Sequence, residues 1–363
     1  MTEVLSRAQV EQTAASIAAV QEPSGAIPWT VGQHTDVWNH VESAMALMVG
    51  GQREAAGRAY DWVRATQRLD GSWPMKVVDG EVEDASGETN MSAYVAVGVW
   101  HHWLVAGDER FVRRMWPTVR RALDFVVSMQ LPWGGIAWSQ EWHDGLPAAV
   151  NEDALLAGSS STYQSLRAGV ALAELLDEPQ VEWELAGGRL GHALREHRDR
   201  FLDKSEFSMD WYYPVLGGAV RADAARELID ARWDTFVEPG IGIRCVSTNP
   251  WATGAETCEL VMALDAIGDR DRALRLLADI QHLRTADGSY WTGYVWPDDV
   301  NWPGEQTTYT AAAVILAVDA LSGETGGSGI MRGTTLAADF AELGLECGCP
   351  SADRVAGVAG RTP

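Results

Sequence analysis

Residues 21–51 read QEPSGAIPWTVGQHTDVWNHVESAMALMVGG, and the rest of the chain repeats parts of this stretch. It consists of a loop that contains Gln, Gly and Trp, a polar cluster, and an apolar helix closed by two glycines. Imperfect copies of the loop follow as Gln67-x3-Gly71-x-Trp73, Gln130-x3-Gly134-x3-Trp138 and Gln281-x6-Gly288-x2-Trp291. Copies separated by roughly 45–60 residues predict a repeat fold whose neighbouring units share one core.

Two kinds of helical segment alternate along the chain. One kind is mostly apolar, which is typical of buried helices, and covers residues 36–49, 91–106, 160–176, 209–216, 253–267 and 307–321. The other kind has a charged or polar face and covers residues 4–20, 53–66, 109–129, 181–201, 222–232 and 269–282. This alternation predicts an all-α fold, an (α/α)6 toroid in which six inner helices are wrapped by six outer ones. Strand signals are weak, and short extended pieces are expected only near 77–82 and 240–246.

The end of the chain has a different composition. Residues 323–329 read GETGGSG, which is typical of a flexible linker. We therefore expect residues 1–325 to form the toroid, and residues 326–363 to form a linker and a loosely packed tail with a helix-like piece at 335–343.

The charge and the cysteines exclude several classes of function. The 51 Asp and Glu residues outnumber the 28 Lys and Arg residues, and the net charge of −23 disfavours nucleic acid and anionic membranes as partners. No apolar run is long enough to span a membrane, and the N-terminus does not resemble a signal peptide. The four cysteines, Cys245, Cys258, Cys347 and Cys349, are too few and too irregular for a metal site. We expect a cytoplasmic protein that needs no metal or other cofactor.

Polar and aromatic residues gather where the inner helices begin. Because inner helices of such a toroid run parallel, their N-termini share one rim, and the chain's 17 tryptophans are frequent in the adjoining loops. Flat indole rings and hydrogen-bonding side chains around a cleft favour carbohydrate as the ligand. The residues expected to bind substrate are Trp29, Trp38, Asn39, Glu42, Trp73, Glu88, Asn90, Trp138, Glu141, Tyr163, Asp210, Tyr212, Tyr213, Trp251, Trp291, Asp298, Asp299, Trp302 and Gln306.

Each of these residues also has a purely structural interpretation. Asp36, Ser160 and Thr253 are favoured helix N-caps, and Thr253 with Glu256 fits a capping box. A tryptophan in a loop can serve only to anchor that loop to the adjacent helix.

Glycoside hydrolysis requires two carboxyl groups on either side of the scissile bond. Asp36 and Glu256 are the predicted catalytic pair, and Glu305 is the rival for either role. The positive end of a helix dipole stabilises an ionised carboxylate, which suits Asp36 as the base. Apolar neighbours favour the protonated form, which suits Glu256 as the proton donor. The adjacent Asp298 and Asp299 are a second possibility.

Two resemblances accompany this interpretation. The loop Gln67-Arg-Leu-Asp-Gly71-Ser-Trp73 resembles the Gln/Trp repeat of triterpene cyclases and protein prenyltransferase β-subunits, but the Asp-rich diphosphate motif and the zinc ligands of those enzymes are missing. The segments WVRATQRLDGSWP, ETNMSAYVAVGVWHHWLVAGD, NPWATGAETCELVMALDAIGD and WPGEQTTYTAAAVILAVDAL are similar to six-hairpin glycosidases. The similarity is greatest to the mycobacterial hydrolases of 3-O-methylmannose polysaccharide and covers about residues 20–325.

The second resemblance implies a particular activity. It implies an endo-α-mannosidase that cleaves internal α-(1→4) bonds of a cytosolic, partly methylated mannan. Terpenoid or prenyl chemistry and a non-catalytic glycan-binding toroid are the alternatives.

Overall fold

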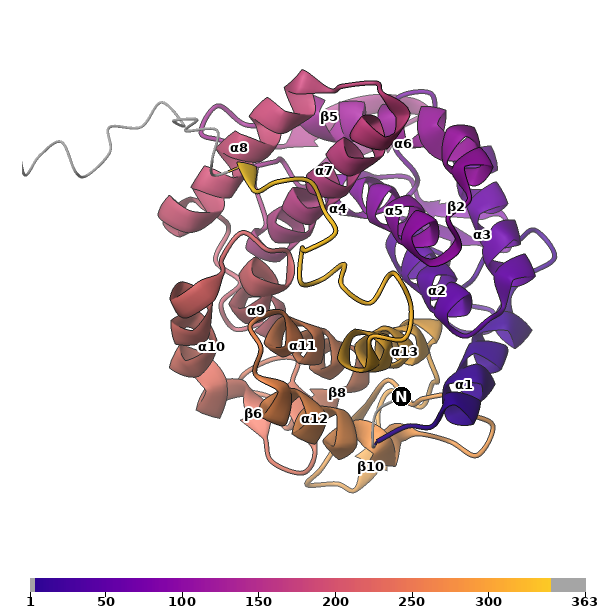
Figure 1. Cartoon of the computed structure of the whole chain (residues 1–363), viewed down its shortest axis with the longest axis vertical. Coiled ribbons are helices and arrows are strands. Elements are labelled where there is room, and N and C mark those ends of the chain that lie inside the picture. The colour runs from indigo at the N-terminus through magenta and orange to yellow at the C-terminus, as the bar shows by residue number, and fades with distance from the viewer. Residues whose placement is uncertain (1–3, 341–363) are drawn as a thin grey trace, which may run out of the picture.

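Six inner helical segments form a closed ring within residues 4–340, the part of the chain that the computed structural model describes (Figure 1). Each inner helix packs against the next, and the last packs against the first. In ring order they are α2 (Val37–Val49), α4 with α5 (Thr89–Ala93 and Val95–Ala106), α7 (Leu156–Leu176), α9 (Ser208–Leu216), α11 (Gly254–Ala266) and α13 (Thr308–Ser322). Nearly every residue of α2 and α13 is buried, as expected for helices that are apolar on all sides.

The outer ring consists of the helices with a polar face. They are α1 (Arg7–Val20), α3 (Arg53–Thr66), α6 (Glu109–Ser128), α8 (Val181–Glu196), α10 (Ala222–Phe236) and α12 (Arg270–Asp279). The predicted (α/α)6 toroid is therefore confirmed. Its boundaries differ in detail, because Tyr94 separates α4 from α5, and the 3-10 turns η1 (Arg198–Arg200) and η2 (Ile280–Leu283) follow α8 and α12.

The repeated Gln loop is a structural brace. The side-chain amide of Gln67 donates to the carbonyl oxygens of Gly71 and Thr118, at 3.0 and 2.9 Å, and so joins its own loop to outer helix α6. Gly71 has a φ of 99°, and an added Cβ would lie 2.0 Å from the carbonyl oxygen of Arg121, so only glycine fits there. Gln21 and Gln130 make the equivalent pairs of hydrogen bonds. The loop therefore fixes the spacing between neighbouring units.

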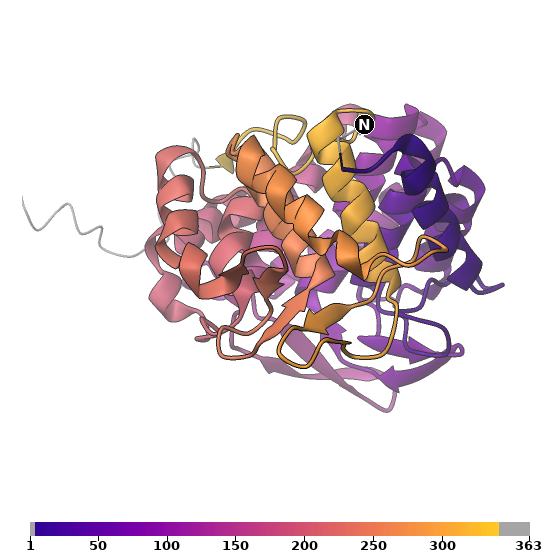
Figure 2. The same ribbon diagram turned by 90° about the horizontal axis from the view of Figure 1, so that it is seen from below.

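Short strands cover the rim where the inner helices begin (Figure 2). They are β1 (Lys76–Val78), β2 (Glu81–Asp84), β3 (Gly87–Glu88), β4 (Ser139–His143), β5 (Leu146–Asn151), β6 (Val237–Glu238), β7 (Gly242–Arg244), β8 (Trp251–Thr253), β9 (Gly293–Val295) and β10 (Val300–Asn301). They form a β1–β2 hairpin, a three-stranded sheet β3-β4-β5, and a five-stranded sheet in the order β10-β9-β8-β7-β6. The described residues contain more strands than the two extended pieces that were expected. Most of these strands are two or three residues long and show no alternation of apolar and polar residues, so the sequence pattern does not reveal them.

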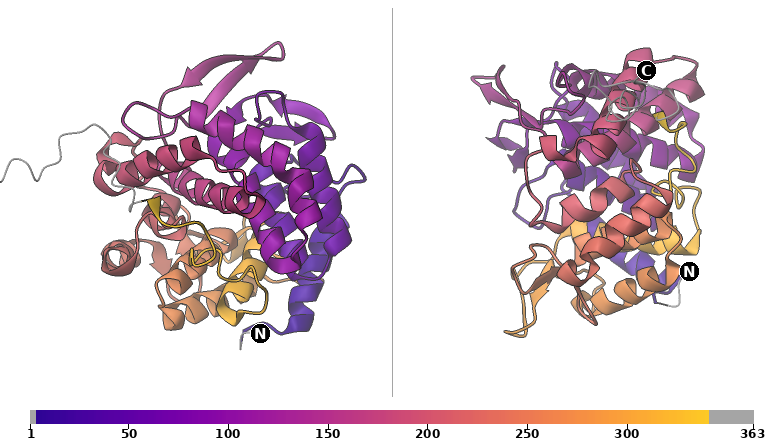
Figure 3. Two further views of the ribbon diagram at one scale, coloured as in Figure 1. Left: turned by 45° about the horizontal axis from the view of Figure 1, so that its top comes forward. Right: turned by 90° about the vertical axis from the view of Figure 1, so that its left-hand side faces the viewer.

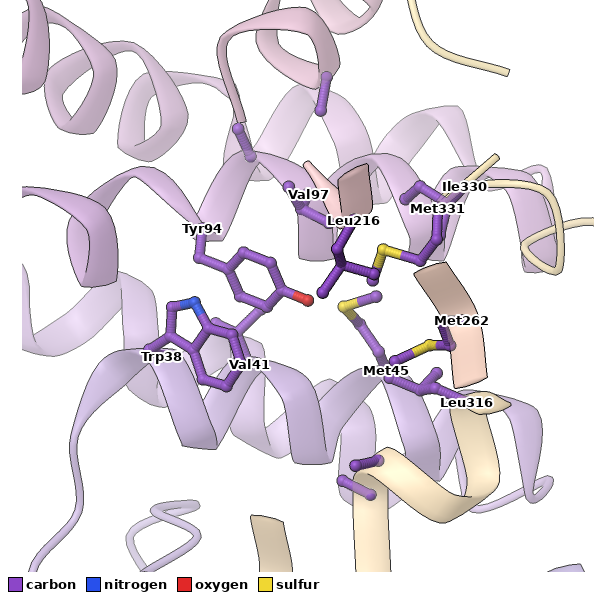
Figure 4. Close-up of a cluster of buried hydrophobic side chains, with 14 of the residues drawn as sticks. Trp38, Val41, Met45, Tyr94, Val97, Leu216, Met262, Leu316, Ile330 and Met331 are labelled. Atoms are coloured by element: carbon purple, nitrogen blue, oxygen red, sulfur yellow. The ribbon is translucent and has the colours of Figure 1, made fainter. Parts of the chain in front are cut away.

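A C-terminal extension closes the opposite end of the ring (Figure 1). Met331 and Ile330 lie among the side chains of the ring interior, near Leu216 and Met262 (Figure 4). The indole of Trp100 donates to the carbonyl oxygen of Thr335 at 2.9 Å. The prediction of a loosely packed tail is thus corrected for residues 326–340, and the piece expected at 335–343 is not an α-helix as far as residue 340. Residues 341–363, including Cys347 and Cys349, lie outside the described part.

No helix in the described residues is both long enough and apolar enough to cross a membrane.

Candidate active site

A pocket of about 350 Å³ lies at the rim where the inner helices begin. Residues from all six inner helical segments line it, which confirms that their N-termini meet at one end of the ring. The lining residues are Trp29, Asp36, Trp38, Asn39, Glu88, Asn90, Met91, Leu155, Ala157, Gly158, Met209, Tyr213, Glu256 and Tyr309. The extension covers the other end of the ring (Figure 1).

Asp36 is positioned at the start of α2. It is the N-cap, and one carboxylate oxygen accepts from the backbone N–H of Asn39 at 2.9 Å. The other oxygen accepts from the Asn39 side-chain amide at 2.5 Å, and the His34 ring lies 3.6 Å from it. The two hydrogen bonds from Asn39 hold the carboxylate in one orientation. Asp36 therefore caps its helix and also presents a carboxylate to the pocket.

Glu256 lies in the first turn of α11 and also lines the pocket. The capping box expected with Thr253 is not formed, because the Thr253 hydroxyl makes no cap hydrogen bond and has no partner. Helix capping therefore does not explain the presence of Glu256. Because α11, α13 and α2 are consecutive in the ring, Glu256 and Asp36 approach the pocket from nearby directions.

Glu88 brings a third carboxyl group into the pocket. It is the N-cap of α4 and accepts hydrogen bonds from the backbone N–H of Met91. Burial raises the pKa of Glu88 to about 8, and the negative charge of Asp36 adds to this rise. The raised pKa favours the protonated form of Glu88 near pH 7, and this form can donate a proton or a hydrogen bond.

Aromatic rings form a continuous stack, the aromatic wall, that lines one side of the pocket and extends to Tyr94, outside the lining. Tyr309 packs against Trp29 and Trp38, with ring centroids 5.7 and 5.4 Å apart. Trp38 stacks in turn on Tyr94 at 4.6 Å. The Trp29 indole donates to Glu305 Oε1 at 2.8 Å, so Glu305 lies behind this wall rather than among the lining residues. The wall offers ring faces and apolar edges to a bound sugar.

Two buried carboxyl groups lie beneath the pocket and hold its tyrosines. Glu259 accepts from the hydroxyls of Tyr213 at 2.8 Å and Tyr309 at 2.6 Å, and also from Tyr212. Glu42 accepts from Tyr94 at 2.5 Å. Sequence reasoning missed Glu259, because a single acid inside an apolar helix gives no local sign of the three tyrosines that surround it.

The two carboxyl groups beneath the pocket also determine how stability depends on pH. Burial raises the pKa of Glu42 to about 7 and that of Glu259 to about 8, and Glu88 shows the same effect. A group whose pKa is higher in the folded than in the unfolded state stabilises the fold at low pH, and this contribution is lost as the pH rises through the folded-state pKa.

We therefore expect a lower melting temperature at pH 8.5 than at pH 6.5, with roughly 1–2 kcal/mol of stability lost for each such group. Burial lowers the pKa values of His40, His101 and His102, so these histidines oppose the loss, but each adds only about 0.4 kcal/mol over this range because an unfolded histidine titrates near its lower end. Thermal unfolding of the wild type and of Glu42→Gln checks this, because the variant should show a flatter pH dependence. Glu54→Gln, on the surface of α3, is the control. A wild-type melting temperature that does not fall over this range would contradict the prediction.

Other predicted binding residues lie around the rim. The indole of Trp251 donates to the carbonyl oxygen of Trp302 at 2.7 Å, and the two rings pack edge to face. Asp298 and Asp299 are exposed between β9 and β10 and do not line the pocket. Trp291 and Trp138 are partly buried, and Gln306 accepts from the Ser289 hydroxyl at 2.6 Å. These residues are not among those that line the pocket.

Asp210 and Glu141 are also absent from the pocket lining. Asp210, in the first turn of α9, accepts from the backbone N–H of Ala157 at 3.3 Å, and burial raises its pKa to about 6. Glu141 is exposed on β4 beside His143.

Some predicted binding residues do not reach the pocket, and these predictions are corrected. Trp73 is 2% exposed and donates to the carbonyl oxygen of Val63, so it anchors its own loop. Tyr163 is fully buried and hydrogen-bonds Asp339 of the extension. Tyr212 and Glu42 are buried beneath the pocket.

The described residues contain no group of three or more His, Cys, Asp or Glu side chains arranged to hold a metal ion.

Solved structures with this fold include enzymes that act on sugars. A wild-type glycosidase superposes with a TM-score of 0.69 at 18% identity, covering 87% of this chain and 98% of that one. A GH63 mannosylglycerate hydrolase from Thermus thermophilus gives 0.62 at 13% identity, covering 85% and 99%. At these identities the likeness shows the fold. No family model matches the chain.

The fold and the carboxyl-lined pocket, together with a closely related mannosidase sequence, define the chain as a glycoside hydrolase. It is 56% identical over 351 residues to the MMP endo-(1,4)-3-O-methyl-alpha-D-mannosidase of Mycolicibacterium hassiacum, covering 97% of this chain and 96% of the relative. The chain belongs to the family of that mannosidase. The resemblance to six-hairpin glycosidases is thus confirmed, whereas the Gln67 loop that resembles prenyltransferases braces the toroid.

Proposed function

We propose that this protein is an endo-α-mannosidase that cleaves internal α-(1→4) bonds of a partly O-methylated mannan. The observation that carries the proposal is the identity of 56% to a relative whose name specifies an endo-acting 3-O-methyl-α-mannosidase. The pocket supports it, because Met91, Leu155 and Met209 give the cleft apolar surface beside its carboxyl groups. Such surface gives the methyl groups of a methylated mannan an apolar contact.

Asp36 and Glu256 are the proposed catalytic pair. Glu256 donates a proton to the glycosidic oxygen as the bond between that oxygen and the anomeric carbon breaks. The carboxylate of Asp36 either stabilises the positive charge that develops at the anomeric carbon or takes a proton from the water whose oxygen forms the new bond to that carbon. Asn39 and the start of α2 hold the Asp36 carboxylate in place. Glu88 and the aromatic wall hold the sugar in the pocket.

We also propose that the protein acts in the cytoplasm on a cytosolic substrate. Cys245 and Cys258 are free thiols in the described part of the chain, which suits a reducing compartment.

Digestion of defined oligosaccharides tests the proposed substrate. The protein is incubated with α-(1→4)-linked manno-oligosaccharides, either 3-O-methylated or unmethylated, and product sizes are followed by chromatography. We expect the methylated chains to yield fragments of intermediate length, and the unmethylated chains to be cut more slowly. Release of single sugars from chain ends would contradict endo action. Binding without cleavage would favour a glycan-binding toroid.

A further inference from the structure

A second groove lies outside the pocket, between two β-hairpins at the same rim. It encloses about 520 Å³, which is within the range of ligand sites. One wall comes from the β1–β2 hairpin and the segment after it, and the other comes from β4, which begins the projecting β4–β5 hairpin (Figure 3). We call it the hairpin groove, and the side chains that characterise it are Lys76, Glu83, Asp84, Glu141, Trp142 and His143.

Trp142 is presented to this groove by an irregularity in β4. The pairing of β4 with β5 shifts register between Gln140 and Trp142, and such a shift re-aims side chains that would otherwise alternate between the two faces of the strand. As a result the adjacent residues Glu141 and Trp142 both line the groove. The guanidinium of Arg68 lies 4.0 Å from the centre of the Trp142 ring and holds it from one side. The indole is therefore fixed in place rather than free to turn.

The hairpin groove lies next to the pocket that holds Asp36 and Glu256. Ser86 lines the groove, and Glu88, two residues later, lines the pocket. On the neighbouring strand Ser139 pairs with Glu88, and Glu141 in the groove is two residues further along. At about 3.3 Å per residue of strand, this step is roughly 7 Å. An extended chain that leaves the pocket in this direction enters the groove.

The chemistry of the groove suits an uncharged, hydroxyl-rich chain. Glu83, Asp84 and Glu141 offer carboxylate oxygens as hydrogen-bond acceptors, and Lys76 is a donor. The excess of carboxylates, together with the chain's net charge of −23, disfavours phosphate or nucleic acid. An indole between such groups is the surface on which a sugar ring packs.

We propose that the hairpin groove is a second binding subsite for the glycan, and that it holds sugar units beyond those in the catalytic pocket. This inference rests on the proposed function, because it takes the same mannan as the ligand. It explains how an endo-acting enzyme distinguishes long chains from short ones, since only a long chain reaches both sites.

Kinetics with a short and a long methylated manno-oligosaccharide test the subsite. For Trp142→Ala we expect the ratio of KM for the long chain to KM for the short chain to rise about tenfold, which corresponds to the loss of one well-buried binding contact. Glu141→Ala, at an exposed position that does not support the hairpin's packing, should raise the same ratio to a smaller extent. Trp233→Ala is the matched control, because Arg272 stacks on that indole at 4.3 Å but the pair lies on the outer ring. It should leave the ratio unchanged.

A binding measurement separates this proposal from the proposed function. Calorimetric titration of the Asp36→Asn protein, with and without Trp142→Ala, reports affinity for the long chain without turnover. Weaker binding after Trp142→Ala supports the subsite even if the wild type cleaves no mannan. The subsite alone is overturned if the KM ratios of Trp142→Ala and Glu141→Ala equal that of the wild type and if Trp142→Ala leaves the affinity of the Asp36→Asn protein unchanged. A wild-type protein that neither binds nor cleaves the methylated chain overturns the subsite together with the proposed substrate.

Discussion

Replacing Asp36 by Asn should lower turnover by about a hundredfold or more, the usual scale for an acid–base group, and leave the melting temperature almost unchanged. Asparagine is as good an N-cap as aspartate, so the hydrogen bond from the Asn39 backbone N–H survives. What disappears is the negative charge in the pocket. Because Asp36 serves as both cap and carboxylate, this substitution separates the two roles.

Asp108→Asn is the control for the Asp36 variant. Asp108 caps outer helix α6 by accepting from the Phe111 backbone N–H at 3.1 Å, and it does not line the pocket. We expect this variant to match the wild type in both turnover and melting temperature. An Asp36→Asn protein that is poorly folded but fully active per folded molecule would show that the residue is only a cap. The catalytic pair would then have to be sought at Glu305 and Asp298–Asp299.

Replacing Glu256 by Gln should have an effect of similar size on turnover. The carboxyl group lines the pocket and takes no part in a capping box, so an isosteric amide should change little in the fold. The loss should be greatest for substrates with a poor leaving group, because these depend most on proton donation. Steady-state kinetics with a manno-oligosaccharide and with an activated aryl mannoside measure this difference.

Two other variants make the assignment of the proton donor testable. Glu88 lines the same pocket, and burial raises its pKa to about 8, which suits a donor at neutral pH. Full activity of Glu256→Gln with loss of activity in Glu88→Gln would transfer the donor role to Glu88. Loss of activity in Glu305→Gln alone would assign the donor role to Glu305, whose carboxylate accepts a hydrogen bond from the indole of the lining residue Trp29.

The amino-acid sequence by itself determined the ring. Apolar and charged helices differ within a few turns of chain, and their alternation depends on no distant contact, so it could be detected without the structure. The Gln loops could be detected in the same way, because in each of them the Gln side chain donates to the carbonyl oxygen of a glycine four residues later. From these two signals followed the closed fold and the rim at which Asp36, Glu88 and Glu256 meet.

Only the tertiary structure decided what individual side chains do at that rim. Trp29 and Trp73 occupy similar loops, yet Trp29 lines the pocket and Trp73 is buried against its own helix. Thr253 and Glu256 have the spacing of a capping box, but the hydrogen bond that would make one is absent. These outcomes depend on which residues, remote in the chain, are neighbours in the folded ring.

The same reason applies to the buried carboxyl groups, the extension and the hairpin groove. Glu259 is surrounded by tyrosines from α9 and α13, which lie 46 to 50 residues away in sequence. Residues 323–329 have the composition of a linker, yet the ring interior offers apolar contacts to Ile330 and Met331 directly after it, which no local pattern reveals. The hairpin groove is formed by segments about 60 residues apart, and the pairing of β3 with β4, between neighbouring units of the ring, places them side by side.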